Sequence, residues 1–306
     1  MHPPSPQRDR VSIQRQVQSF IQRRFFYNER LQNLVWRKYY TPNAKTPSVV
    51  ISKRAQAHLE ELREEGVTVV HGFESVADHI ENTYFSVIEG RQKDSSQPLE
   101  KTDLGERDDV TNSEHYRVSF KDPGLAPMLF DPDVCGILYN YYQRQPYYRG
   151  QPRVIKNAMS KDITFEQFSK LEVSAKFHTD YYRQIAMMFL VNDLSESDTH
   201  LEYAVKSHKD RHSWKRYSYD DRNVQERYAI KHCVGPRGSL ILMDAGSGLH
   251  RGAHKKGTVR KILHCLVTTG HYFPEEDEKM NVADWPALPN FPDYVRHMID
   301  DLRTGS

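Results

Sequence analysis

The sequence has little cysteine, and its three cysteines follow no metal-binding or redox spacing. Cys135, Cys233 and Cys265 are odd in number and widely separated, and no Cys-x-x-Cys pair occurs. A secreted scaffold built on disulfides carries a denser, even-numbered set, so this class is excluded. We therefore expect a protein of the reducing cytoplasm.

Long apolar runs, a strong charge excess and glycine-rich phosphate motifs are also lacking. No stretch approaches the roughly 20 apolar residues that a membrane helix needs. The net charge is only +2 over 306 residues, which gives no global attraction to nucleic acid or to a membrane surface. No P-loop, dinucleotide fingerprint or internal repeat is found. We expect a small-molecule partner, with no nucleic acid and no membrane, and the sequence leaves the oligomeric state open.

Short, strand-like segments fill the second half of the chain. Hydrophobic residues make up 38% of the sequence, with 18 Tyr and 13 Phe, which is enough for a substantial core. Segments rich in β-branched and aromatic residues alternate with turn signals such as Gly235-Pro236-Arg237-Gly238. They lie at 153–156, 186–191, 201–205, 228–233, 239–243 and 262–267. This spacing predicts a mainly β fold with flanking helices, of the sandwich or jelly-roll kind.

The first half of the chain is predicted to be helical and is divided by charge. Residues 1–45 hold nine Lys and Arg against two acidic residues, a local balance of +7, and we expect a basic N-terminal helical extension there. Its charge is either the solvated face of packed amphipathic helices or an arm for a phosphate or macromolecular partner. Residues 46–306 are expected to form one domain, with a long polar loop at about 91–115.

One motif in the β region carries the spacing of a metal site. In a strand, residues i and i+2 project from the same face, so His178 and Asp180 would point together. Such spacing also arises by chance among 15 histidines. Only His178-Thr179-Asp180 leads into a long apolar strand. His58/Glu60 and His79/Glu81 lie on predicted helices and His208/Asp210 lies in a charged run, and His200/Glu202 is a further example.

Candidates for a third metal ligand and a positively charged side chain follow downstream. His250 begins an expected strand, and His254 lies in the turn that follows with two lysines, so both are candidates and His254 is the less favoured. Two imidazoles and one carboxylate form the facial triad of non-haem Fe(II) oxygenases. Arg260 opens the next strand and has the guanidinium fork that would hold a carboxylate. An ordinary surface salt bridge is the alternative for Arg260.

In order along the chain, these features resemble the phytanoyl-CoA dioxygenase family of Fe(II)/2-oxoglutarate oxygenases. The resemblance covers roughly residues 55–273. It is carried by Leu62-Arg63-Glu64-Glu65-Gly66-Val67-Thr68-Val69-Val70, His178-Thr179-Asp180, Ser207-His208-Lys209, Gly238-Ser239-Leu240-Ile241-Leu242-Met243-Asp244, Leu249-His250-Arg251-Gly252 and Arg260. Gly252 and His254 stand where the family usually has a small polar residue and an asparagine, and the arginine comes one residue early.

The resemblance implies a double-stranded β-helix (cupin-like jelly roll) that binds Fe(II), 2-oxoglutarate and O2. His178, Asp180 and His250 would hold iron, and Arg260 would bind 2-oxoglutarate. Family relatives that halogenate replace the carboxylate, so Asp180 favours hydroxylation of a small molecule with release of succinate and CO2. Tyr182, Arg183 and Gly252 are candidates for the substrate pocket. The alternatives are a non-catalytic small-molecule-binding module, or an oxygenase that modifies a macromolecule through its basic N-terminal region.

Overall fold

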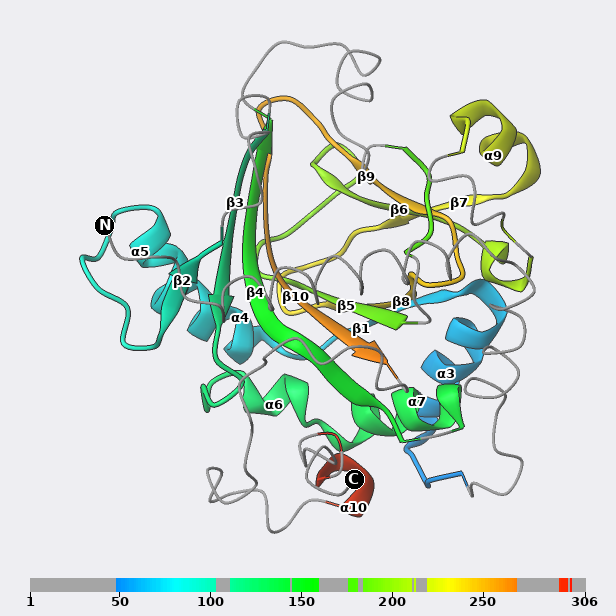
Figure 1. The fold of residues 1–306 in the computed structure, drawn as a ribbon, viewed down its shortest axis with the longest axis horizontal. Coiled ribbons are helices and arrows are strands. Elements are labelled where there is room, and N and C mark those ends of the chain that lie inside the picture. Colours follow the sequence, from blue (N-terminus) through cyan, green and yellow to red (C-terminus); the bar gives the residue numbers. More distant parts are fainter. Residues whose placement is uncertain are drawn as a thin grey trace, which may run out of the picture.

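Two antiparallel β-sheets face each other, with helices on the outer side of the larger one (Figure 1). The computed structural model describes residues 48–102, 111–143, 145–159, 176–180, 184–210, 212, 219–268, 292–296 and 298. The basic segment 1–45 and the pocket candidates Tyr182 and Arg183 lie outside these ranges. Among the described residues, no helix has the length and apolar character to cross a membrane.

The described strands form one sheet of seven and one of three. The larger sheet has the order β1-β8-β5-β10-β4-β3-β2, with β1 (Val67–Val70), β8 (Leu240–Asp244), β5 (Gln184–Leu190), β10 (Val259–Thr268), β4 (Tyr147–Met159), β3 (Thr111–Val118) and β2 (Leu99–Lys101). The smaller sheet has the order β7-β6-β9, with β7 (Ile230–Cys233), β6 (His200–Ala204) and β9 (His250–Ala253). This arrangement confirms the predicted mainly β fold with a jelly-roll core.

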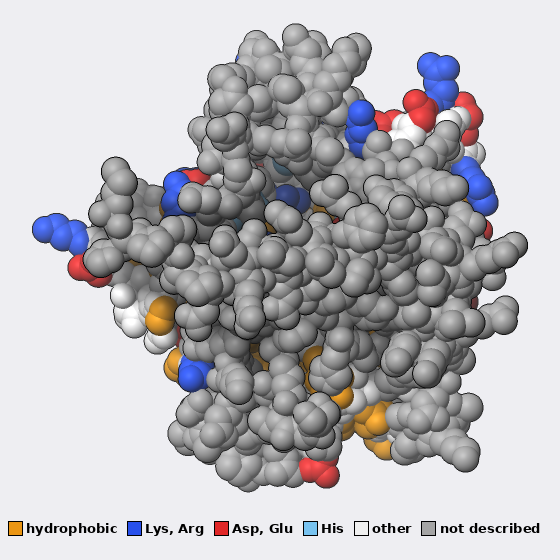
Figure 2. Space-filling view, viewed as in Figure 1, with side chains coloured by type: hydrophobic (Ala, Val, Ile, Leu, Met, Phe, Trp, Pro, Cys, Tyr) orange, Lys and Arg blue, Asp and Glu red, His pale blue; other side chains and the backbone are white. Residues whose placement is uncertain are grey.

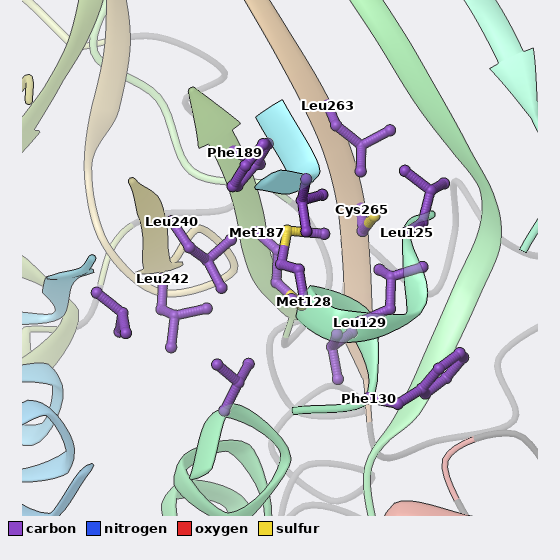
Figure 3. Close-up of a cluster of buried hydrophobic side chains, with 14 of the residues drawn as sticks. Leu125, Met128, Leu129, Phe130, Met187, Phe189, Leu240, Leu242, Leu263 and Cys265 are labelled. Carbon is purple, nitrogen blue, oxygen red and sulfur yellow. The ribbon is translucent and has the colours of Figure 1, made fainter. Parts of the chain in front are cut away.

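Alternation along the strands separates an outer from an inner face of the large sheet. Leu263 and Cys265 on β10 join a core with the helical segment around Met128 and Leu129 (Figure 3). Ile262, from the intervening position, packs instead with a second cluster that includes residues of the small sheet. Period-2 alternation therefore makes the inner face the one that meets the small sheet. Arg260 and His264 share the face of Ile262.

The α3 (Lys53–Glu65) and α7 (Pro132–Tyr142) helices begin at the caps that their sequences predict. In α3 the side chain of Ser52 accepts a hydrogen bond from the N–H of Ala55, and Gly66 ends the helix in the left-handed region at φ 88°. A Cβ at Gly66 would also lie 2.3 Å from the Tyr203 hydroxyl. The α7 helix starts at an aspartate cap followed by proline. The remaining helical elements are α4 (Glu74–Ile80), η2 (Glu81–Phe85), α5 (Ser86–Ile88), α6 (Ala126–Leu129), η4 (Ser207–Lys209), α9 (Asp221–Arg227) and α10 (Asp293–Arg296).

The predicted polar loop at 91–115 is only partly a loop. Residues 99–101 and 111–118 form β2 and β3, which pair with each other at one edge of the large sheet. Charged side chains are tolerated on such an edge because one side of the strand is solvated. Because β2 and β3 contain few apolar residues, a prediction based on hydrophobicity does not find them. Residues 103–110, in the middle of the predicted loop, lie outside the described ranges.

Candidate metal and co-substrate site

The backbone brings His178 and His250 face to face. The N–H of His178 donates to the carbonyl of His250 at 3.0 Å, and the N–H of His250 donates back at 2.9 Å. The pair thus forms an isolated antiparallel bridge, although His178 lies before β5 and His250 opens β9. Their imidazole centroids are 4.5 Å apart. Two residues that are 72 positions apart in the chain are therefore placed together by main-chain hydrogen bonds alone.

Asp180 is fixed from two sides. Its N–H donates to the carbonyl of Ala245 at 2.8 Å, which anchors the segment against the end of β8. Its Oδ2 accepts a hydrogen bond of 2.6 Å from the side-chain amide of Gln184. The other oxygen, Oδ1, lies 3.8 Å from Nε2 of His250. One carboxylate oxygen therefore remains available to a metal, while the Gln184 amide holds the other. A hydrogen bond from a residue that does not itself bind the metal orients the ligand in this way.

The three candidate ligands form one group with defined ring orientations. Ligand atoms of His178, Asp180 and His250 all lie within 4.8 Å of one another. Nδ1 of His178 donates to the carbonyl of Lys176 at 2.7 Å, and Nδ1 of His250 donates to the carbonyl of Gly248 at 3.1 Å. Because a carbonyl only accepts, each Nδ1 carries a proton, so in the neutral ring the lone pair lies on Nε2. Both Nε2 atoms are then in the form that binds a metal.

Electrostatics favour neutral imidazole at His178. Burial is the main cause that lowers its pKa to about 4, and the nearby His250 lowers it further. Charging the ring would cost desolvation energy, since little water reaches it. The side chain is therefore neutral over the physiological range, and metal binding need not displace a proton from it.

Arg260 is a buried cation with no acidic partner among the described residues. Nε and Nη2 donate to Oδ1 of Asn157 at 3.2 and 2.8 Å. Asn157 is its direct neighbour across β4 and β10, and its own amide donates to the hydroxyl of Ser113 on β3. The Arg260 residue is 9% exposed, and burial lowers its pKa to about 10. A buried charge is costly unless an opposite charge compensates it. The arrangement therefore suits an anion that binds from outside the chain.

His254 lies near Arg260 and Gly252 lies next to His254, and neither belongs to the ligand group. Among the described residues, the group that contains His178 and Asp180 includes His250 and not His254. Burial lowers the pKa of His254 to about 3, and the positive charge of Arg260 contributes. A Cβ on Gly252 would stand 2.7 Å from Nε2 of His254. Glycine at this position therefore leaves room for the imidazole.

Two polar residues of the site, Gln184 and Asn157, were not predicted from the sequence. Gln184 holds Asp180, Asn157 holds Arg260, and His264 lies on the inner face of β10 between them. Burial lowers the pKa of His264 to about 4, and its neighbours include both Asp180 and Arg260. In the space-filling view, basic and histidine side chains are visible deep in a hollow (Figure 2). The available signal was a polar residue at an inward position of an otherwise apolar strand.

Comparison with known proteins supports the fold. No family model and no curated protein sequence matches the chain. Among solved structures, the epimerase SnoN in complex with Fe3+, alpha ketoglutarate and nogalamycin RO has a TM-score of 0.51 at 10% identity, covering 72% of this chain and 86% of that chain. EctD from S. alaskensis, in its apoform, has a TM-score of 0.47 at 13% identity, covering 74% and 79%. The likeness to SnoN supports the jelly-roll fold of this chain.

Proposed function

We propose that this protein is an Fe(II)/2-oxoglutarate-dependent dioxygenase that hydroxylates a C–H bond of a small molecule and releases succinate and CO2. The observation that carries the proposal is the convergence of His178, Asp180 and His250 near an inner face that carries Arg260. The solved SnoN complex holds Fe3+, alpha ketoglutarate and a small molecule on a similar fold. The resemblance to the phytanoyl-CoA dioxygenase family points the same way and remains a prediction.

The residues present fit both Fe(II) and 2-oxoglutarate. Two imidazoles whose Nδ1 atoms each donate to a backbone carbonyl, together with one carboxylate oxygen, match the donor set of a non-haem Fe(II) centre. Arg260 supplies the cation that the far carboxylate of 2-oxoglutarate requires, and it has no acid of its own among the described residues. When bound, Fe(II) and 2-oxoglutarate supply the activation of O2 that the chain itself cannot provide.

The chain's own residues position the reactants and control their protonation. Lys176 and Gly248 fix the two imidazole tautomers through their carbonyls, and Gln184 fixes the carboxylate. Asn157 holds the Arg260 guanidinium through Nε and Nη2, which leaves Nη1 for an incoming carboxylate. Retention of a carboxylate at Asp180 favours hydroxylation over halogenation, because a halide would need that metal position. Tyr182, Arg183 and Gly252 remain the proposed substrate-pocket residues, and we place the protein in the cytoplasm.

The test is anaerobic addition of Fe(II) and 2-oxoglutarate to the full chain. We expect a visible charge-transfer band that is lost in His178→Ala, Asp180→Ala and His250→Ala. His71→Ala is the matched control, because this exposed histidine contacts Ser239 and does not belong to the group of candidate ligands. Loss of the band in His254→Ala together with its retention in His250→Ala would reverse the assignment of the third ligand.

A second measurement separates catalysis from binding. Aerobic succinate release, followed across a set of small metabolites, is expected to rise with the true substrate and to be absent in Asp180→Ala. A wild-type protein that shows no band and releases no succinate would contradict the oxygenase proposal and favour the non-catalytic binding module.

A further inference from the structure

A second cluster of metal-ligating side chains lies on the small sheet. His200 and Glu202 are i and i+2 on β6, and His232 is the direct cross-strand partner of Glu202 on β7. All three therefore project from one face. On the adjacent strand β9, Arg251 pairs with Glu202 and His250 pairs with Tyr203. Because Tyr203 belongs to the core between the sheets, the cluster occupies the opposite, outer face.

The separations of the three ligand atoms suit one small cation. Nε2 of His200 lies 2.9 Å from Nδ1 of His232. Oε1 of Glu202 lies 3.8 Å from the first of these atoms and 3.5 Å from the second. The point equidistant from three atoms with these separations is about 2.0 Å from each, the length of Zn–N and Zn–O bonds. This point lies in the plane of the three atoms, so a tetrahedral site with a fourth ligand would need small shifts of the side chains.

Neighbouring groups leave the ligand atoms available. Nδ1 of His200 donates to the carbonyl of Asp198 at 2.6 Å, so Nε2 keeps its lone pair. Oε2 of Glu202 accepts from Nε of Arg251 at 2.6 Å, which leaves Oε1 for a metal. His200 is 1% exposed and Glu202 is 7% exposed, whereas His232 is partly open to solvent. The buried side is thus fixed, and the open side admits a water ligand.

A hydrogen-bond relay is the competing explanation for this cluster. In a relay, Nδ1 of His232 would donate to Nε2 of His200 across their 2.9 Å separation. That explanation leaves Oε1 of Glu202 without a role, since 3.5 and 3.8 Å are too long for hydrogen bonds to the two rings. A metal would use all three atoms at once.

We propose that His200, Glu202 and His232 bind a divalent cation of the zinc type, with water as the fourth ligand. Two imidazoles favour Zn2+ over Mg2+ or Ca2+, which prefer an all-oxygen shell. The site is separate from the proposed iron centre and does not depend on it. The cation would join β6 to β7. Through Glu202 it would also order Arg251, which pairs with Asp221 on α9 and stacks 4.5 Å from the ring centre of Phe177.

The test measures Zn2+ binding to the full chain by equilibrium dialysis and metal analysis. His178→Ala removes the first site, so this variant is expected to retain one tightly bound Zn2+ per chain. His178→Ala with His232→Ala is expected to retain none. Adding His71→Ala to His178→Ala instead should leave one. A rise in melting temperature with Zn2+ is expected for the first variant and not for the double variant. Mg2+ should bind to neither.

Glu202→Gln in the His178→Ala background keeps the shape of the side chain and an acceptor for Arg251. We expect it to weaken Zn2+ binding at least tenfold. Equal Zn2+ stoichiometry in the single and double histidine variants, or unchanged affinity in Glu202→Gln, would show a hydrogen-bond relay only and overturn the proposal. The anaerobic Fe(II)/2-oxoglutarate band is measured separately, so failure of one site is distinguishable from failure of the other.

Discussion

Arg260→Met is expected to stabilise the folded protein while it destroys co-substrate binding. Burial lowers the pKa of Arg260 from 12.5 to about 10, and the side chain is protonated at pH 7 in both the folded and unfolded states. The desolvation cost of the folded cation, about 3 kcal/mol, is therefore fully present at neutral pH. Loss of the hydrogen bonds to Asn157 offsets about 1 kcal/mol of the gain. We expect the free energy of unfolding to rise by about 1–2 kcal/mol.

The same substitution removes the proposed partner of the far carboxylate of 2-oxoglutarate. Truncating one member of a buried charge pair typically costs about 2–5 kcal/mol, so the KM for 2-oxoglutarate should rise at least about 30-fold. Thermal denaturation and urea titration measure stability, and titration of succinate release measures KM. Added 2-oxoglutarate should raise the melting temperature of the wild type and leave that of the variant unchanged.

Arg251→Met is the matched control for this experiment. Arg251 is equally buried, but it pairs with Glu202 and Asp221. Removing it leaves two acidic groups uncompensated, so we expect a loss of about 3–5 kcal/mol. If Arg260→Met also destabilised the protein by several kcal/mol, the inference that this guanidinium is reserved for an external anion would be refuted.

Three further predictions concern the surroundings of the site. Gln184→Leu removes the donor to Asp180 and should weaken Fe(II) binding about 10–100-fold, measured by metal titration; an unchanged affinity would mean that the amide does not orient the carboxylate. His264→Gln should reduce the loss of stability between pH 6.5 and 4, by up to about 3 kcal/mol in urea denaturation, because the neutral buried histidine has a folded pKa near 4 and its protonation favours unfolding; a parallel pH profile would contradict this. Gly66→Ala should cost about 2–4 kcal/mol by the same assay, since alanine is strained at φ 88° and its Cβ meets the Tyr203 hydroxyl.

The strands and helices that could be predicted from the sequence are those with strong local signals. The apolar runs at 186–190 and 262–267 lie in β5 and β10, and the serine cap and terminal glycine of 52–66 bound α3. The hairpin of β2 and β3 could not be found this way, because its strands are polar and gain their stability from pairing at a sheet edge.

The residue types of the candidate site could be predicted from the sequence, but the tertiary contacts that bring them together could not. The i, i+2 spacing predicts that His178 and Asp180 point together, and in the structure they lie in an extended segment before β5 that is held by an isolated bridge. The spacing could not decide between His250 and His254, because that choice depends on the antiparallel bridge between His178 and His250. The roles of Gln184 and Asn157 depend likewise on tertiary contacts and strand register. The histidine–glutamate spacing at 200 and 202 gains its significance only when β7 brings His232 alongside.

The length of the turn before β9 determines which side chains of this strand face inward and which face outward. Asp244 holds the turn by accepting hydrogen bonds from the N–H groups of Ser247 and Gly248, both at 2.9 Å. One residue more or fewer here would exchange the two faces of β9, turning Arg251 inward and His250 outward. A cation would then face the candidate metal ligands, and Glu202 would lose its partner. The length of this turn is therefore as constrained as any ligand, and a single-residue insertion should be more damaging than most substitutions.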